Sequence, residues 1–437
     1  MAWKTIRRHG LPGERELCDS GKDDATGKED PMKRFNPEQA MCDVRREFGE
    51  HGGVCPSISR SATFTVMEPG IMPEIFAGLR GPDKDGCFLY SRHFNPTVNI
   101  LNRYLSAMEG TEAAMATASG MSAISCTLLQ RCRAGDHIVS SRTVYGGTHA
   151  LLAELLPQLG ITVTFVDAAD SEAWKAAIRP ETKVLYTEAI GNPTLKIANL
   201  PEIADIAHDR GLQFVVDNTF APMILSPAQL GADVVVYSMT KFINGASDLI
   251  AGAICGSQEL INQLMDLHTG RVMLLGPTLD PTAAFEILQR LPHLAIRMRE
   301  HSRRAMAVAE RLEALGTSVR YPGLRTHPQY EVMTAMMNPE FGFGGMLNLD
   351  CKTREKAEAL MSQLQNTERF GLIAVSLGYF DTLMSCSGSS TSSEIPPEDQ
   401  ETMGLSPGLL RFSIGYTGDL EERLEQLERA VRAVGLA

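Results

Sequence analysis

The stretch VVVYSMTKFI (residues 234–243) carries a single lysine, Lys241, just beyond an apolar run long enough to form a buried strand. In open α/β sheets, ligands bind in the crevice outside the carboxyl ends of the strands. A lysine at this position is therefore predicted to face a ligand rather than bulk water. The other interpretation is a surface lysine that happens to follow a core strand, since such junctions are common.

A second apolar run, residues 212–217, ends in the carboxylate of Asp217. Runs of this kind are typical of strands covered on both faces, so Asp217 and Lys241 are predicted to share one edge of a sheet. An ion pair between them is one interpretation. The other is a cofactor that offers an aldehyde to the lysine and a pyridine nitrogen to the aspartate.

The surrounding sequence predicts an α/β fold with a largely parallel sheet, because short apolar runs alternate with helical patterns from about residue 110 to 255. A segment with a proline at its start and a glycine stop, residues 201–210, is predicted to be a crossover helix. The further strands are predicted at residues 114–117, 138–140, 163–166 and 184–187.

After about residue 290 the pattern changes to amphipathic helices with strands between them, which predicts a smaller α+β domain. The helices are expected at residues 296–315, 354–365 and 420–434, and the strands at 345–349 and 410–414. We expect an N-terminal arm (residues 1–93, the first 40 or so flexible), a large domain (94–292) and a C-terminal domain (293–437). The serine-rich residues 385–397 are expected to form a loop or short linker.

Composition excludes several classes of function. The chain has 437 residues, with 41 basic and 53 acidic side chains and a net charge of -12, so nucleic acid is not an expected partner. No run is apolar enough to span a membrane, and the start of the chain lacks the apolar segment of a signal peptide, which favours a cytoplasmic protein. Nine dispersed cysteines without a CxxC pair and ten dispersed histidines favour reduced thiols and no metal site.

The sequence Ser119-Gly120-Met121 lies between a predicted strand and a predicted helix. A glycine at such a turn lets backbone amides approach a phosphate, and the helix dipole favours the negative charge. Ser238 and Thr240, on either side of residue 239, offer hydroxyl donors to the same group. The alternative is that the glycine only closes the turn.

The segment DNTFAPMILSPAQLGADVVVYSMTKFINGASDLIAG (residues 217–252) resembles the signature region of the cysteine and methionine metabolism pyridoxal-phosphate enzymes, the trans-sulfuration family. Methionine γ-lyase, cystathionine γ-lyase and cystathionine γ-synthase belong to that family. The resemblance covers residues 50–437 or so and implies fold type I, the aspartate-aminotransferase-like fold. Its other motifs are YSRHFNPT (90–97), ASGMSAI (118–124), YGGTHALL (145–152), EAIGNPT (188–194), AVSLG (374–378) and GLLRFSIG (408–415).

The resemblance implies a role for each side chain around pyridoxal 5'-phosphate (PLP). Lys241 would form the Schiff base and move protons, Asp217 would pair with the ring nitrogen, and Asn192 would bond the ring oxygen. Tyr145 would stack on the ring and act as an acid toward the leaving group, unless it is simply a core tyrosine.

The resemblance also implies how the phosphate and the substrate are held. The phosphate would contact Gly120, Met121, Ser238 and Thr240, together with Tyr90 and Arg92 of a neighbouring subunit. A homo-oligomer is therefore expected, a tetramer built from active dimers. Arg411, assisted by Ser376, would bind the α-carboxylate of an amino-acid substrate, unless this arginine belongs to a core ion pair.

Several residues differ from those usual in the family, and we expect them to lie where the substrate side chain is selected. They are Tyr237, Phe242, Ala246, Gly147, Val375, Val272, Met273 and Ser392. These differences suggest a substrate outside the usual sulfur compounds, for example an oxygen-linked amino acid such as canavanine.

The expected reaction is γ-elimination from an L-amino acid that carries a leaving group on Cγ. One alternative is a γ-replacement synthase, which would use the same cofactor residues and admit a nucleophile. A second is a catalytically silent member of the family with a binding role. The intact lysine, aspartate, tyrosine and arginine argue against the second alternative.

Overall fold

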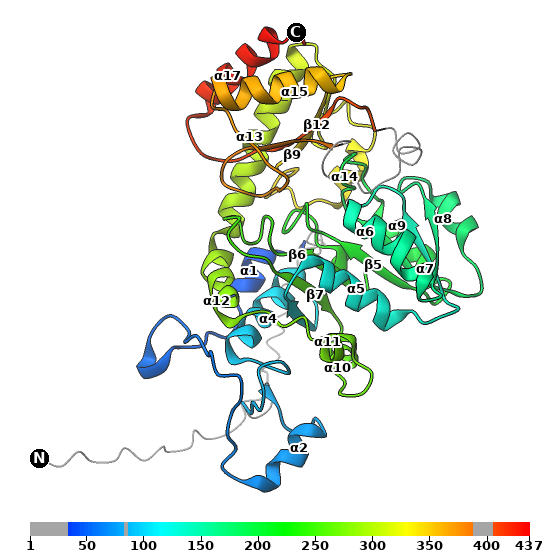
Figure 1. Cartoon of the computed structure of the whole chain (residues 1–437), viewed down its shortest axis with the longest axis vertical. Helices are drawn as coiled ribbons and strands as arrows, with labels where there is room; N and C mark the ends of the chain where they lie inside the picture. Colours follow the sequence, from blue (N-terminus) through cyan, green and yellow to red (C-terminus); the bar gives the residue numbers. More distant parts are fainter. Residues whose placement is uncertain (1–33, 83–85, 388–404) are drawn as a thin grey trace, which may run out of the picture. The chain divides into compact units, whose positions relative to one another are not determined.

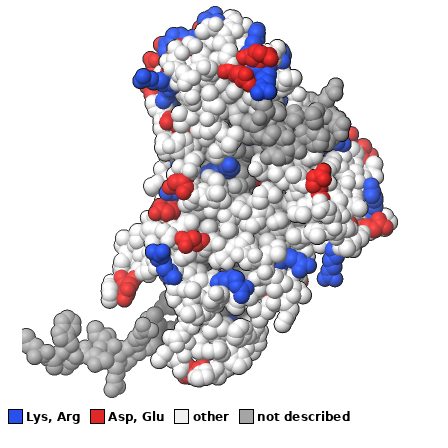
Figure 2. Space-filling view, in the orientation of Figure 1, with Lys and Arg blue, Asp and Glu red and all other residues white. Residues whose placement is uncertain are grey.

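The computed structural model describes residues 34–82, 86–387 and 405–437. Within it, Phe35–Ala437 forms one compact unit. None of the described helices is long and apolar enough to cross a membrane. On the face drawn in Figure 2, acidic and basic side chains are interspersed.

The larger of two sheets has the predicted, mostly parallel arrangement, in the strand order β1-β7-β6-β5-β4-β2-β3. The five strands β6, β5, β4, β2 and β3 run parallel, with one register shift between β2 and β4 at His137 and Ile138, and β7 runs antiparallel to both of its neighbours. The strands are β1 (Ala113–Thr117), β2 (His137–Ser141), β3 (Thr162–Val166), β4 (Thr182–Glu188), β5 (Gln213–Asp217), β6 (Val234–Ser238) and β7 (Gly252–Gly256).

Strand β7 was not predicted, because GAICG is short and begins and ends with glycine, which is unfavourable in strands. All five of its residues are buried, and the close approach of neighbouring backbones explains the glycines. A side chain at Gly252 would collide with the backbone carbonyl of Ser119.

Helices cover both faces of this sheet (Figure 1), and two separate groups of buried apolar side chains form its core layers. The predicted crossover helix is α9, whose second residue is Pro201. The helices and single turns of this region are α4 (Pro96–Glu109), α5 (Gly120–Arg131), α6 (Gly146–Ala150), η3 (Leu151–Leu155), α7 (Leu156–Gln158), α8 (Ser171–Ala177), α9 (Leu200–His208), η4 (Pro227–Leu230), α10 (Gln258–Leu264), α11 (Arg271–Leu275) and α12 (Pro281–Arg290).

The second sheet has five strands in the order β10-β11-β12-β9-β8 and a core of its own. The three predicted helices and both predicted strands are present within two residues of their expected ends, apart from a π-helical turn that prolongs α15. The elements are η5 (Leu291–His293), α13 (Leu294–Ala314), β8 (Val319–Arg320), α14 (Tyr330–Met336), β9 (Met346–Asp350), α15 (Arg354–Ser362), η6 (Gln363–Thr367), β10 (Leu372–Ile373), β11 (Leu383–Cys386), β12 (Leu409–Ser413) and α17 (Leu420–Ala433).

Two loop predictions need correction. Ser385 and Cys386, expected in a serine-rich loop, belong to β11, where pairing with β12 buries them. Residues 37–40 were expected in a flexible arm but lie in α1 (Pro37–Cys42), which is capped by the side chain of Asn36 and buries Met41. Residues 1–33 and 388–404 lie outside the described residues. The remaining elements before α4 are η1 (Glu50–Gly52), η2 (Pro69–Ile71) and α2 (Met72–Phe76).

Candidate active site

Lys241 lies in a turn that follows the carboxyl end of β6, as predicted, and its side chain is partly buried. Its Nζ donates a hydrogen bond to Ser376 Oγ at 3.1 Å. Ser376 precedes β11 of the second sheet in the chain. Burial, and secondly the positive charge of Arg411, lower the pKa of Lys241 from 10.5 to about 8. The amine is thus closer to its neutral form, which is the form that attacks an aldehyde.

Asp217 ends the adjacent strand β5, and its carboxylate is buried. One of its oxygens, Oδ1, accepts the backbone N–H of Thr219 at 2.9 Å. Burial raises the pKa of Asp217 to about 6, although the hydrogen bonds with Thr219 act in the opposite direction. Within the described ranges no ion pair joins Asp217 to Lys241, so the ion-pair interpretation of these two residues is not supported.

Glu188 is a site residue that the sequence alone did not identify. It is opposite Asp217 in the β4–β5 register, and its two carboxylate oxygens accept the backbone N–H groups of Tyr145 (2.6 Å) and Asn192 (2.7 Å). Burial and the neighbouring Asp217 raise the pKa of Glu188 well above its ordinary value. Its place at the start of the EAIGNPT motif was the available signal, but only the sheet register shows what it contacts.

The predicted phosphate turn is present at the start of α5. Ser119 caps this helix, and the amides of Gly120 and Met121 are its first two N–H groups. A Cβ on Gly120 would lie 2.6 Å from the Cβ of Ser238, so only glycine fits here without movement of the neighbouring strand. The free helix terminus beside hydroxyl side chains fits the phosphate group of a cofactor.

The hydroxyl of Thr240 lies beside the backbone of Ala251. It accepts a hydrogen bond from the N–H of Ala251 at 3.0 Å and donates one to the carbonyl of the same residue at 3.3 Å. Ser238 donates its backbone N–H to Thr219 Oγ1 at 2.8 Å, which ties the end of β6 to the residue that also bonds Asp217.

Arg411 lies on β12 and is 3% exposed. Its Nη1 donates to Asn192 Oδ1 at 2.9 Å and its Nη2 to the carbonyl of Ser376 at 3.2 Å. No carboxylate within the described part of the chain lies at ion-pair distance from it, so the alternative of a core ion pair is not supported. Because a buried cation without an anionic partner is costly, this guanidinium is suited to receive a carboxylate from a ligand.

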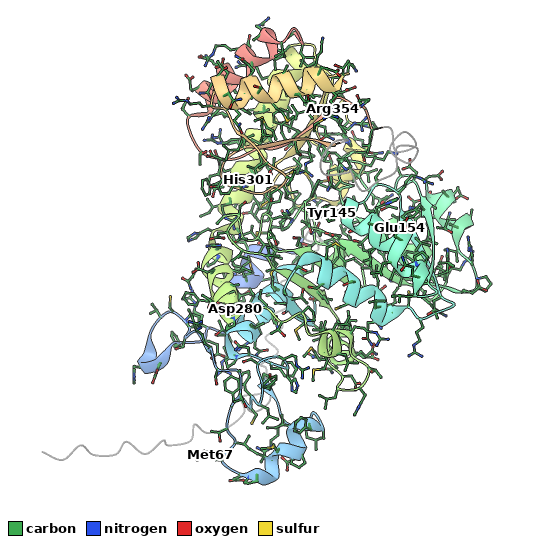
Figure 3. The ribbon with its side chains drawn as sticks, viewed as in Figure 1. Met67, Tyr145, Glu154, Asp280, His301 and Arg354 are labelled. Atoms are coloured by element: carbon green, nitrogen blue, oxygen red, sulfur yellow. The ribbon has the colours of Figure 1, made fainter. Side chains whose placement is uncertain are left out.

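Tyr145, labelled in Figure 3, is 41% exposed and so is not a core tyrosine. Its ring lies against Gly147, where an added Cβ would meet the ring carbon Cε1 at 2.7 Å and the sulfur of Met121 at 3.4 Å. The glycine at this position therefore leaves room for the tyrosine ring.

Tyr90 and Arg92 contact each other, and none of their hydrogen bonds among the described residues is with another predicted site residue. Arg92 Nη1 donates to the carbonyl of Met273 at 2.9 Å, and its guanidinium lies 5.7 Å from the centre of the Tyr90 ring. Tyr90 forms a bridge with Thr63 and is exposed. This placement is compatible with the expectation that both residues serve a neighbouring subunit.

The expectation that the unusual residues lie where the substrate side chain is selected is wrong for Tyr237, whose hydroxyl is in the core, and Phe242, Val272 and Met273 are also buried in the single chain. The hydroxyl of Tyr237 hydrogen-bonds Glu109 and accepts from Asn218 Nδ2 at 2.9 Å. Val375, in contrast, is 67% exposed next to Ser376. Ala246 is partly buried, and Ser392 lies outside the described residues.

Comparison with known proteins agrees with this geometry. The family model for Cys/Met metabolism PLP-dependent enzymes matches residues 40–432. The chain is 56% identical to methionine gamma-lyase of Arabidopsis thaliana, over 90% of each chain. It is 38% identical to L-methionine gamma-lyase of Fusobacterium nucleatum subsp. polymorphum, over 80% of this chain and 89% of the relative.

A solved structure with a similar fold is that of a putative O-acetylhomoserine (thiol)-lyase from Campylobacter jejuni, which holds N'-pyridoxyl-lysine-5'-monophosphate. The TM-score is 0.84 at 25% identity, and the alignment covers 91% of this chain and all of that one.

Proposed function

Because the chain belongs to the Cys/Met metabolism PLP-dependent enzyme family, we propose that it is a γ-lyase that eliminates the Cγ substituent of methionine. The observation that carries this proposal is that two basic side chains of different kinds, Lys241 and Arg411, lie close together at Ser376. Lys241 has a lowered pKa, while Arg411 has no anionic partner among the described residues, and both contact Ser376. Together they suit an amino acid whose carboxylate is held while its Cα proton is removed.

PLP, when bound, supplies an electron sink for the charge that is left when the Cα proton departs. Lys241 would hold the cofactor and would carry protons between the substrate carbons. Asp217 would keep a positive charge on the ring nitrogen, and Asn192, which accepts a hydrogen bond from Arg411, would orient the ring. General acid–base steps of this kind contribute about 10²- to 10⁴-fold each.

Tyr145 would cover the ring and donate a proton to the leaving group, and this residue is 41% exposed. The phosphate would be held by the helix terminus at Gly120 and Met121 and by the hydroxyls of Ser238 and Thr240. Arg411 and Ser376 bind the substrate carboxylate, since a planar guanidinium suits two-pronged contact with it.

The active protein is proposed to be a homotetramer built from dimers, in which Tyr90 and Arg92 complete the partner's phosphate site. Large apolar side chains in the segment before α4 are highly exposed in the single chain, which supports a covered surface in an oligomer. Met67 is 89% exposed (labelled in Figure 3). The others include Phe48, Val54, Phe76 and Leu79.

A mixing experiment tests the shared site. Lys241→Ala and Arg92→Ala should each be inactive alone, and subunit exchange between them should restore about a quarter of the wild-type activity, because half of the dimers then contain one intact site of two. No recovery after exchange, verified by mass spectrometry of differently tagged chains, would contradict the proposed assembly.

The proposed domains are residues 1–93, 94–292 and 293–437, a division supported by the separate cores of the two sheets. A cytoplasmic location is proposed as well, which suits nine dispersed cysteines without a CxxC pair.

The second candidate function is γ-replacement, which is favoured by the structural similarity to a putative O-acetylhomoserine (thiol)-lyase.

To separate the two candidate functions, purified enzyme is incubated with methionine, cystathionine, homocysteine, O-acylhomoserines or canavanine, and ammonia and 2-oxo acid are measured with and without an added thiol. The proposal expects methionine to give both products without a thiol, and Lys241→Ala to give neither. Ammonia release from canavanine far above that from methionine would favour an oxygen-linked substrate instead.

A further inference from the structure

Helix α13 carries three nearly buried cationic or imidazole side chains on one face, at positions 297, 301 and 304. Residues at this i, i+4, i+7 spacing lie one above another along a helix. The functional assignments above use none of Arg297, His301 and Arg304. Each of them binds backbone carbonyls. Apart from the carbonyl of Arg290, which Arg297 contacts at 3.4 Å, these carbonyls belong to two segments that carry the proposed site.

Arg297 binds the segment that follows Lys241. Its Nη1 donates to the carbonyl of Phe242 and its Nη2 to the carbonyl of Ile243 at 2.9 Å. A side chain on Gly245 would collide with this guanidinium, so the turn is shaped around the arginine. Because Lys241 lies in a turn and not in a regular strand or helix, these two carbonyls have no ladder to join, and Arg297 satisfies them.

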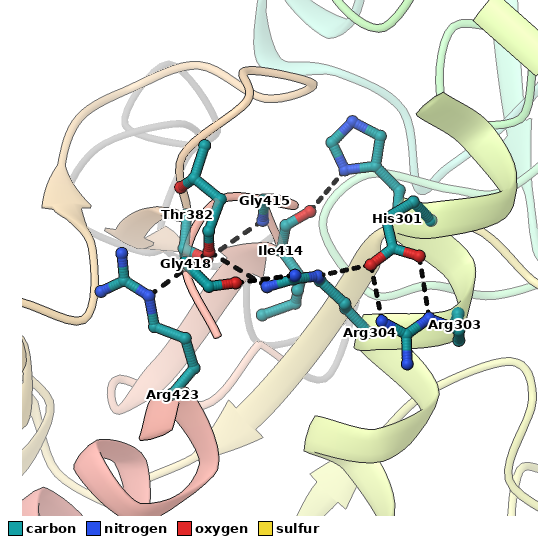
Figure 4. Close-up of polar contacts among 10 residues, drawn as sticks. His301, Arg303, Arg304, Thr382, Ile414, Gly415, Gly418 and Arg423 are labelled. Carbon is teal, nitrogen blue, oxygen red and sulfur yellow. Dashed lines mark hydrogen bonds and ion pairs between the residues drawn. The ribbon is translucent and has the colours of Figure 1, made fainter. Parts of the chain in front are cut away.

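His301 and Arg304 bind the segment that follows β12, the strand of Arg411 (Figure 4). His301 Nδ1 contacts the carbonyl of Ile414 at 2.6 Å, and burial lowers the pKa of His301 to about 4, so the neutral ring donates this hydrogen bond. Arg304 donates to the carbonyls of Thr417 (3.0 Å) and Gly418 (2.8 Å).

The two segments also meet on the ring of His301. Its edge-to-face neighbours are Phe242, at 5.1 Å, and Tyr416, at 5.0 Å. One face of a single 21-residue helix therefore holds both the turn of Lys241 and the loop that follows the strand of Arg411.

We propose that Arg297 is a positioning residue for Lys241, and that His301 and Arg304, on the same helix, position Arg411 through the loop that follows its strand β12. Resting on the proposed function, this assigns α13 the task of setting the distance between the amine that acts on Cα and the guanidinium that holds the carboxylate. Misplacement of a reacting group by about 1 Å can cost about 100-fold in rate.

The first test uses the PLP-loaded enzyme without substrate, so its outcome does not depend on which amino acid is the substrate. The visible absorbance of the bound cofactor is titrated with pH in the wild type, Arg297→Met, Arg297→Lys and the control Arg303→Met. Arg303 is on the same helix, and within the described part of the chain its side chain bonds Glu300 alone. The proposal expects a displaced midpoint in Arg297→Met, a smaller displacement in Arg297→Lys and none in the control.

The second test separates the two ends of the helix face by steady-state kinetics. Arg297→Met is expected to lower kcat about 10- to 100-fold with little change in KM, because it moves the proton-transferring amine. Arg304→Met is expected to raise KM mainly, because it loosens the strand that binds the carboxylate. If Arg297→Met and Arg304→Met change kcat and KM by the same factors, the division of roles between the two arginines is overturned.

Thermal unfolding is measured in parallel, since a purely structural role for Arg297 would lower Tm alone. A folded Arg297→Met with the wild-type absorbance midpoint and kcat overturns the proposal. If this variant does not fold, Arg297→Lys decides, and wild-type values of both quantities in it overturn the proposal equally. A wild-type enzyme inactive on every amino acid would instead refute the proposed function and leave the absorbance result valid.

Discussion

The lowered pKa of Lys241 predicts that the cofactor-free enzyme binds PLP covalently with a midpoint near pH 8. The amine must lose its proton before it attacks the aldehyde, so attachment is slow below the midpoint and fast above it. The difference between 10.5 and about 8 corresponds to about 3 kcal/mol. At pH 7 the neutral fraction is then about 300 times that of an ordinary lysine.

Two physical causes contribute to this lowered pKa, and a substitution separates them. Burial is the larger cause, and the charge of Arg411 is the second. Arg411→Gln removes the repulsion between the two cations but leaves the lysine buried. We therefore expect its midpoint to lie above that of the wild type and below 10.5.

The assay follows the visible band after apoenzyme is mixed with saturating PLP, by stopped flow from pH 6 to 10. Arg354→Gln serves as the matched control, because this arginine (labelled in Figure 3) is exposed and bonds Glu358 on its own helix. A wild-type midpoint near 10.5 would refute the electrostatic argument. An Arg411→Gln midpoint at or below the wild-type value would refute the contribution of the arginine.

Two further predictions concern the core behind the site. Burial raises the pKa of Glu109, the partner of Tyr237, from 4.5 to about 8, so the wild type loses stability as pH rises through this range while Glu109→Gln does not. The variant's gain in the free energy of unfolding should grow to at most about 5 kcal/mol by pH 8 in urea titrations, and a gain independent of pH would contradict this. Gly120→Ala should weaken PLP binding, measured by equilibrium dialysis. It should also lower the free energy of unfolding by about 1–3 kcal/mol, because the added Cβ would lie 2.6 Å from the Cβ of Ser238. Gly70→Ala, which meets no atom within 4 Å, is the control.

The α/β class, six of the seven strands in the large sheet and the main helices could be predicted from sequence, because apolar periodicity and end signals are local properties. The same holds for Lys241 and Asp217, since each directly follows or ends an apolar run. Family motifs then added Tyr145, Asn192 and Arg411. Strand β7 was missed because its residues are small, and only contact with the backbones on both sides makes them favourable there.

Tertiary structure decided what those residues contact. The β4–β5 register places Glu188 opposite Asp217, and the chain brings the backbone N–H groups of Tyr145 and Asn192 to its carboxylate. Tyr237 was expected to face the substrate, yet the alternation of side chains along β6 turns it toward Glu109 in the core. Arg297 in the sequence is one of many arginines on an amphipathic helix, and only the packing of α13 against the turn after Lys241 shows what it holds. Local sequence determines which elements form and which side chains end them, whereas distances between residues far apart in the chain are set by packing.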